Sequence, residues 1–267
     1  MQNITINREF GRSAFGSDPA AYHAARPSYP DWVFEMLVER GCLAGGTRTF
    51  EIGAGTGIAT RRLLELGADP LVVIESDNRM AQYLAASMPE AALEIYTVPF
   101  EEAELPEGVF DFGFSATAFH WLDEPVALQK IARLLKPGGW WGMVWNVYGN
   151  HERENLFHHA TKHLLEGALS PSQGAANLPY ALDFKARLAA LEETNAFENI
   201  EYRAGEWPLV LTAEQTVALY ATYSPISIRP DRDELLAELG RIAREQFKDR
   251  VIRDIVTCLY IARKKCY

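Results

Sequence analysis

Two kinds of apolar pattern alternate along the first 146 residues of the chain. Short runs rich in β-branched and aromatic residues, such as 49–52, 70–75 and 109–116, are separated by segments whose apolar residues recur at helical spacing. This alternation predicts an α/β fold with a parallel, doubly wound sheet, whose ligands bind at the carboxyl ends of the strands. Two later apolar runs, 200–211 and 251–262, bring the expected number of strands to seven.

A glycine-rich loop connects the first predicted strand to a helix that starts at Thr60. Gly53, Gly55 and Gly57 lack a Cβ, so they can adopt positive φ and let a ligand lie against bare backbone. The first N–H groups of the helix face the loop and favour a polar or anionic group there. The dinucleotide-binding fingerprint would place its third glycine at position 58, which is Ile58 in this chain.

Two carboxylates flank this loop in the predicted sheet. Glu51 precedes the loop, where it would repel a pyrophosphate but suits a cationic amine. Glu75 ends the second predicted strand, about 20 residues after the glycines, where an acid can accept both ribose hydroxyls of an adenosine. The alternative is a ligand-free turn followed by a solvated loop acid. The two signals at this separation favour a ligand that contains a nucleoside.

Four motifs resemble those of one enzyme family. The E-x-G-x-G-x-G pattern that begins at Glu51 resembles the first motif of the class I S-adenosylmethionine (SAM)-dependent methyltransferases. The patterns F-D-x-x-x-S-x-x-x-F-H-W over 110–121 and L-L-K-P-G-G over 134–139 are similar to motifs of the small-molecule branch, often called type 11. The pattern Y-x-x-x-R-P-x-Y-P over 22–30 resembles an N-terminal segment that covers the cofactor mouth as a lid, and trans-aconitate methyltransferases have a similar one. The resemblance implies a Rossmann-like, seven-stranded, mostly parallel sheet with an antiparallel last strand, a helical insertion and a lid.

The same resemblance suggests four parts of the chain. These are an N-terminal lid segment (1–30), a SAM-binding core (31–146), a helical insertion (147–200), and a C-terminal part with substrate-side helices that completes the sheet (201–267). Within the insertion, His159 and His163 are spaced i, i+4, but no third ligand is near in sequence. We therefore expect no metal site.

The resemblance also implies that the protein binds SAM and releases S-adenosylhomocysteine (SAH). Met80 would rest on the adenine, unless it packs in the core. Phe100 and Glu101 would contact the adenine ring and its amino group, and the register after the third strand leaves Glu102 or Glu104 as alternatives to Glu101. The implied cofactor-binding residues are Glu51, Gly53, Ala54, Gly55, Gly57, Glu75, Ser76, Met80, Phe100, Glu101, Ala116 and Phe119.

His120 is the candidate catalytic residue, because it sits where the fourth strand opens toward the expected cleft. It could act as a general base for an acceptor that must lose a proton, or it could line the cofactor wall. A carboxylate acceptor would need no base but would favour cations such as Arg26 or Arg229. The candidates for the substrate wall and lid, each of which could instead pack in the core or lid, are Tyr22, Arg26, Trp121, Trp145 and Tyr223.

These features predict in-line transfer of a methyl group from SAM to oxygen, nitrogen or a carboxylate of a small-molecule acceptor. A nicotinamide-dependent dehydrogenase is one alternative, although Ile58 and Glu51 disfavour it. A non-catalytic SAM-binding protein is the other. An exocyclic base amine is not the expected acceptor, because the fourth motif lacks the Pro-Pro-aromatic run typical of nucleic-acid amino-methyltransferases.

Composition narrows the expected partners and location. The formal net charge of −10 disfavours a nucleic acid, because surfaces that bind nucleic acids are basic. No stretch of about 18 uncharged apolar residues predicts a membrane span, and the N-terminus lacks the apolar segment of a signal peptide. Three scattered cysteines, without metal spacing, favour a reduced, cytoplasmic protein. The oligomeric state, monomer or homodimer, stays open.

Overall fold

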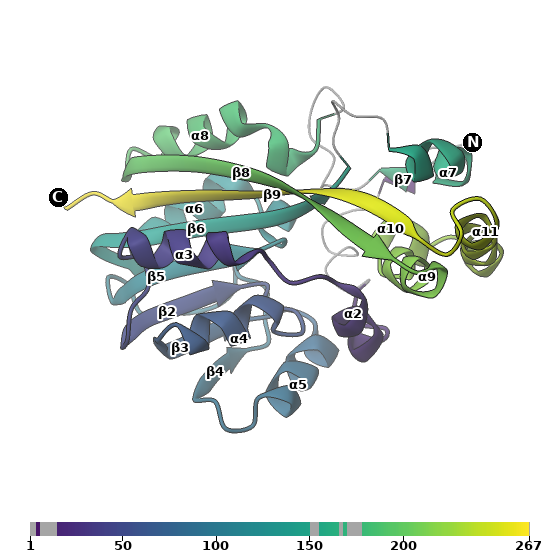
Figure 1. Cartoon of the computed structure of the whole chain (residues 1–267). Coiled ribbons are helices and arrows are strands. Elements are labelled where there is room, and N and C mark those ends of the chain that lie inside the picture. The colour runs from purple at the N-terminus through teal and green to yellow at the C-terminus, as the bar shows by residue number, and fades with distance from the viewer. Residues whose placement is uncertain (1–3, 6–14, 150–154, 166–167, 170–177, 267) are drawn as a thin grey trace.

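The computed structural model describes residues 4–5, 15–149, 155–165, 168–169 and 178–266. A seven-stranded sheet has the strand order β4-β3-β2-β5-β6-β9-β8 (Figure 1). The strands from β2 to β6 pair in parallel, whereas β9 is antiparallel to both β6 and β8. This is the Rossmann-like, doubly wound sheet that the sequence predicts. The strands are β2 (Thr47–Ile52), β3 (Ala68–Ile74), β4 (Leu93–Tyr96), β5 (Phe110–Ala116), β6 (Leu135–Tyr148), β8 (Phe197–Leu211) and β9 (Val251–Lys264).

Helices cover both faces of the sheet, because its central strands present apolar side chains on both sides. In β3, Leu71 and Val73 face one layer and Val72 and Ile74 face the other, as the two-residue period of a strand requires. With both faces buried, the strand ends are left for ligands. One layer contains α3 (Asp31–Glu39), α4 (Ile58–Glu65) and α5 (Asn78–Ser87), and the other contains α6 (Glu124–Leu134) and α8 (Phe184–Glu193).

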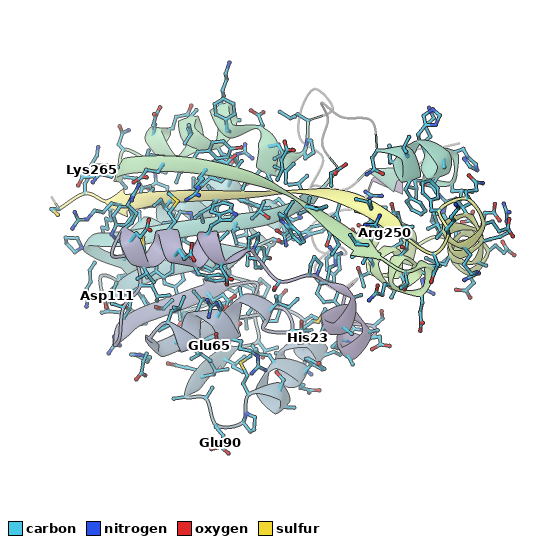
Figure 2. The ribbon with its side chains drawn as sticks, viewed as in Figure 1. His23, Glu65, Glu90, Asp111, Arg250 and Lys265 are labelled. Atoms are coloured by element: carbon cyan, nitrogen blue, oxygen red, sulfur yellow. The ribbon has the colours of Figure 1, made fainter. Side chains whose placement is uncertain are left out.

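A third hydrophobic cluster lies beyond the carboxyl ends of the parallel strands, where β8 and β9 extend past the rest of the sheet (Figure 1). Arg250 and Lys265, which bracket β9, lie at opposite ends of the molecule in Figure 2. None of the described helices is long and apolar enough to cross a membrane. The cluster is formed by α7 (Leu156–Leu165), α9 (Ala213–Ala221), α10 (Ser224–Ser227) and α11 (Arg232–Glu245).

The stretch 147–200 contributes to two parts of the molecule. Its first helix, α7, packs against α11 in the third cluster, whereas α8 packs against α6 and β8 on the sheet. The spacing of apolar residues over 155–169 predicts one helix, which in the structure ends at Leu165 and is followed by β7 (Ala168–Leu169), paired in parallel with β1 (Ile4–Thr5). The sequence over 171–179 predicts a loop, most of which lies outside the described residues.

The N-terminal segment contains a helix that the apolar pattern does not reveal. This helix, α2 (Pro19–Ala25), is capped by Asp18, whose side chain accepts a hydrogen bond from the Ala21 N–H at 2.9 Å. None of its residues is buried, so it has no apolar stripe that a periodicity could detect.

Candidate active site

A cavity of about 490 Å³ lies at the carboxyl ends of the parallel strands, beside the third cluster. Small-molecule sites typically enclose about 300–1,000 Å³. Because β2, β5 and β6 separate β3 from β9 in the sheet, residues that follow β3 and residues on β9 lie on opposite sides of the cavity. We define the β3 side as Gly53, Gly55, Glu75, Met80 and Phe100, and the β9 side as Arg26, Tyr148, Tyr220, Tyr223 and Arg253.

The glycine loop after β2 has positive φ angles of +68° at Gly53, +57° at Gly55 and +86° at Gly57. A Cβ at Gly53 would lie 2.4 Å from the Cβ of Ala118, a short side chain that cannot turn aside. A Cβ at Gly55 would meet no atom within 4 Å, although this residue lines the cavity. Packing therefore requires glycine at position 53, whereas glycine at position 55 leaves room for a ligand.

Glu75, directly after β3, is held by the glycine loop. Its Oε2 accepts a hydrogen bond from the Gly55 N–H and its Oε1 accepts one from the Asp77 N–H, each at 2.8 Å. Burial raises the pKa of Glu75, and these backbone donors oppose the rise by stabilising the carboxylate. Each oxygen retains acceptor capacity, so the carboxylate suits a ligand with two neighbouring hydroxyls.

Glu51 lies at the end of β2 and is fully buried. Its Oε2 accepts a hydrogen bond from the Thr60 hydroxyl at 2.6 Å, but its Oε1 has no partner among the described residues. Burial raises the pKa of Glu51 to about 7; the Thr60 bond opposes this rise, and the negative charge of Glu75 adds to it. An unpartnered buried oxygen is costly, and a cationic ligand group at the loop would offset that cost.

The segment 22–30 connects the two sides of the cavity. Three of its side chains form hydrogen bonds with the glycine loop, the end of α9 and the turn after β5. This position suits the predicted lid, since the segment can keep water from a bound ligand. The His23 ring (labelled in Figure 2) is hydrogen-bonded to the Thr56 hydroxyl at 3.0 Å. Arg26 donates to the Thr222 carbonyl at 3.0 Å, and the hydroxyls of Tyr29 and Thr117 are hydrogen-bonded at 2.7 Å.

His120 lies in a 3₁₀ turn (Phe119–Trp121) and lines the cavity. Its Nδ1 accepts a hydrogen bond from the Trp145 indole N–H at 3.1 Å. Because an indole only donates, Nδ1 is unprotonated and the neutral ring carries its proton on Nε2. Burial, and secondly the charge of Arg26, lowers the pKa of His120 to about 3, so the ring is neutral at pH 7. His120 is therefore a hydrogen-bond donor in this geometry, which does not support the predicted general base.

Two arginines line the β9 side. Arg26 lies over three tyrosine rings, and Arg253 donates a hydrogen bond to the Tyr220 hydroxyl. Arg229, the other predicted clamp, is instead paired with Asp231 at 2.7 Å and does not line the cavity. No sequence motif marks Arg253, but the charged pair Arg253-Asp254, which interrupts the apolar run 251–262, is a signal that could have drawn attention to it.

The structure brings most of the predicted site residues together. The cofactor candidates at the cavity are Gly53, Ala54, Gly55, Glu75, Ser76, Met80, Phe100 and Ala116, and the other candidates there are Tyr22, Arg26, His120, Trp121, Trp145 and Tyr223. Glu51, Gly57, Glu101 and Phe119 do not line it. Glu101 is exposed in the turn after β4, as are its alternatives Glu102 and Glu104. Phe119 is buried in the core against Trp141, with 5.5 Å between the ring centroids.

Residues 50–142 match a family model described as a methyltransferase domain, type 11. Over these residues the chain is similar to methyltransferase domains. The chain is 36% identical over 144 residues to an uncharacterized methyltransferase of Mycobacterium tuberculosis, and the match covers 54% of this chain and 56% of the relative. The chain thus spans about half the length of that curated relative. It is 26% identical over 235 residues to an uncharacterized methyltransferase-like protein of Schizosaccharomyces pombe, and the match covers 86% of each.

The fold of the chain also has solved counterparts. Phosphoethanolamine N-methyltransferase 2 of Haemonchus contortus, in complex with phosphomonomethylethanolamine and SAH, matches with a TM-score of 0.58 at 16% identity. That match covers 94% of this chain and 57% of the other, and at this identity it concerns the fold alone. Together the matches confirm the predicted fold and support the predicted methyltransferase family.

The β3 side of the cavity fits SAM. The open space at Gly55 admits a ligand against the backbone, and the Glu75 carboxylate suits the two ribose hydroxyls. The unpartnered Oε1 of Glu51 suits a positively charged ligand at the same loop. Met80 and Phe100 provide an apolar wall for a purine ring.

Proposed function

We propose that the protein transfers the methyl group of SAM to a small-molecule acceptor by in-line displacement, at oxygen, nitrogen or a carboxylate. The observation that carries this proposal is the continuity of the cavity. The β3 side, which fits SAM, and the β9 side, which is lined by arginine and tyrosine, share one space of about 490 Å³. A cofactor at the glycine loop would therefore face an acceptor on the β9 side with no wall between them.

In the proposed mechanism, SAM supplies a methyl group on a positively charged sulfur, and the protein binds and orients both reactants. Gly55 allows close approach to the backbone, and Glu75 accepts hydrogen bonds from the ribose. The segment 22–30 excludes water from the cavity. Proximity and orientation of this kind contribute up to roughly 7–11 kcal/mol in favourable cases.

His120 would position the acceptor rather than remove its proton. Its Nδ1 is engaged by Trp145, and its Nε2 carries the ring proton, so it can donate one hydrogen bond to an acceptor oxygen. The reaction then suits an acceptor that reaches the site already deprotonated.

The proposal also covers the type of acceptor and the location of the protein in the cell. A cavity of this volume, together with a net charge of −10, favours a small molecule over a nucleic acid. A cytoplasmic location rests on the cysteines: Cys42 and Cys258 are buried as free thiols, and Cys266 is exposed.

Two measurements test the proposed function. Isothermal titration calorimetry should detect binding of SAH but not of NAD, and tight binding of NAD without SAH would contradict the proposal. Incubation with SAM and a panel of small acids, amines and phenols should release SAH with at least one of them. Gly55→Val, which fills the open space at the loop and leaves the β9 side intact, should abolish both signals. Binding of SAH without release from any panel member would favour a non-catalytic SAM-binding protein.

A further inference from the structure

The two sides of the cavity carry opposite charges. Among the described residues that line it, Glu75 is the acid, on the β3 side, and Arg26 and Arg253 are the arginines, on the β9 side. A positively charged cofactor is attracted to the side with the acid. The acceptor is left with the side that carries two permanent positive charges.

None of the described residues neutralises either arginine. Arg26 donates to the Thr222 carbonyl at 3.0 Å and Arg253 donates to the Tyr220 hydroxyl, and neither is paired with a carboxylate in the described part of the chain. Within the same residues, the Nε atoms of both are buried without a partner. Arg253 is only 4% exposed. A buried cation is costly unless it is paired, so these two groups are poised for a ligand that brings the missing negative charge.

Tyrosine rings hold Arg26 in place without supplying that charge. Its guanidinium carbon lies 5.1 Å from the ring centroids of Tyr22 and Tyr223. A third ring, that of Tyr148, lies at 5.7 Å. Such cation–π contacts offset part of the cost of burial, and the Tyr148 hydroxyl also accepts a hydrogen bond from Arg26, but neither brings a negative charge. The Tyr223 hydroxyl is buried without a partner among the described residues, so it remains able to donate.

We infer that the acceptor is an anion, a small molecule with a carboxylate or phosphate group that Arg26 and Arg253 bind on the β9 side. This inference rests on the proposed function and names its substrate class. Arginine N–H groups bind such oxygens through parallel hydrogen bonds, and each unpartnered Nε supplies one donor. The Nε2–H of His120 and the hydroxyl of Tyr223 add further donors, so the polar groups on this side all match an oxygen-rich anion.

An anionic acceptor also removes the need for a base. With a carboxylate, an oxygen lone pair would attack the methyl carbon of SAM. The C–O bond would form as the C–S bond breaks, and the electron pair of the C–S bond would stay on sulfur. The products are a methyl ester and SAH, and no proton moves. A reaction without proton transfer agrees with the state of His120, whose Nδ1 accepts the Trp145 hydrogen bond and whose Nε2 already carries a proton.

Binding of matched probes to the SAH-loaded protein tests this inference. The probes are phenylacetate, phenyl phosphate and the neutral phenylacetamide, measured by isothermal titration calorimetry. We expect at least one of the two anions to bind at least tenfold more tightly than phenylacetamide, and the tighter anion identifies the group. Arg253→Gln should weaken anion binding at least tenfold. Arg253→Lys, which keeps the positive charge but loses the paired N–H donors of the guanidinium, should weaken it less. Arg133→Gln is the matched control, because Arg133 is an exposed arginine paired with Glu107 on the surface.

Retained SAH affinity, within about twofold, shows that each Arg253 variant is folded and leaves the β3 side intact. Equal binding of phenylacetamide and both anions would overturn the inference, and so would unchanged anion binding by Arg253→Gln. Failure of the unaltered protein to bind SAH would instead contradict the proposed function, so the two failures are distinguishable.

Discussion

The β3 and β9 sides of the cavity differ both in charge and in how the chain builds them. The β3 side comes from strand ends and turns of consecutive βα units, and backbone N–H groups fix its acid, Glu75. The β9 side is assembled from the N-terminal segment, β6, α9 and β9. One of its hydrogen bonds, from Arg26 to Thr222, joins residues 196 positions apart.

This difference suggests that the β3 side binds the cofactor and the β9 side binds the acceptor. Local backbone geometry builds the β3 side, because glycine φ angles and strand ends define it, and its shape fits the cofactor. Long-range packing builds the β9 side, where two buried arginines have no carboxylate partner among the described residues. If the comparison is correct, substitutions on the β3 side should change SAH affinity or loop stability, and substitutions near the β9 side should change acceptor binding alone.

The largest effect is expected from Glu75→Ala. This substitution removes the ribose acceptor and leaves the N–H groups of Gly55 and Asp77 without their carboxylate. Hydrogen bonds to a charged group are worth about 1.5–3 kcal/mol each, so the loss of two ribose bonds should weaken SAH binding about a hundredfold or more. Calorimetric titration with SAH measures this loss, and Glu107→Ala, on an exposed acid, is the control. An unchanged affinity would remove Glu75 from the cofactor site.

A second prediction compares two neighbouring glycines of the β3 side. Gly53→Ala brings a Cβ within 2.4 Å of the Ala118 Cβ, and we expect it to lower the free energy of unfolding by about 2–4 kcal/mol. Gly55→Ala meets no atom, so its cost should be limited to about 1 kcal/mol of left-handed backbone strain. It should instead weaken SAH binding, because the new methyl group occupies ligand space. Urea unfolding followed by circular dichroism separates the two, and equal losses of stability would contradict the packing described for this loop.

The sequence predicts the β3 side much better than the β9 side, for physical reasons. Glycine spacing and an acid at a strand end are local signals, so the loop, Glu75 and the parallel sheet could all be predicted. The turn after β4 lacks such a signal, and the acid expected there, Glu101, is exposed. Arg253 reaches the cavity only through the antiparallel pairing of β9, which no local pattern encodes. The helix α2 was missed because it buries no apolar stripe.

Glu51→Gln tests the raised pKa of the buried acid beside the glycine loop, and its expected effect on the free energy of unfolding is smaller. Burial raises the pKa of Glu51 from 4.5 to about 7, so the folded protein binds a proton that the unfolded chain releases between these values. Stability that is present below pH 4.5 is therefore lost as the pH rises through about 7, by up to about 3 kcal/mol at about 1.4 kcal/mol per pKa unit. The Gln side chain can still accept the Thr60 bond but leaves an amide N–H unpaired, so the net gain of the variant at pH 8 should be about 1–2 kcal/mol.

Urea unfolding of both proteins without ligand, at pH 5 and pH 8, measures this difference. The variant should also bind SAH more weakly, since the charge that favours a cationic ligand is gone. A stability difference that does not grow with pH would contradict the raised pKa of Glu51.

The smallest effect is expected at His120, which lies between the two sides. As a neutral donor it is replaced best by Gln, whose amide N–H lies near the position of Nε2, so His120→Gln should retain kcat/KM for an acceptor within about threefold. His120→Ala should lose about tenfold, close to 1.4 kcal/mol, and both variants should bind SAH as the parent protein does. A general base would instead contribute about a hundredfold or more, lost in both variants. Because burial lowers the pKa of His120 to about 3, the rate should show no step near pH 6.5 that disappears on substitution. A step of that kind, or an equally large loss in the Gln variant, would restore His120 as the base and would favour an acceptor that arrives with its proton.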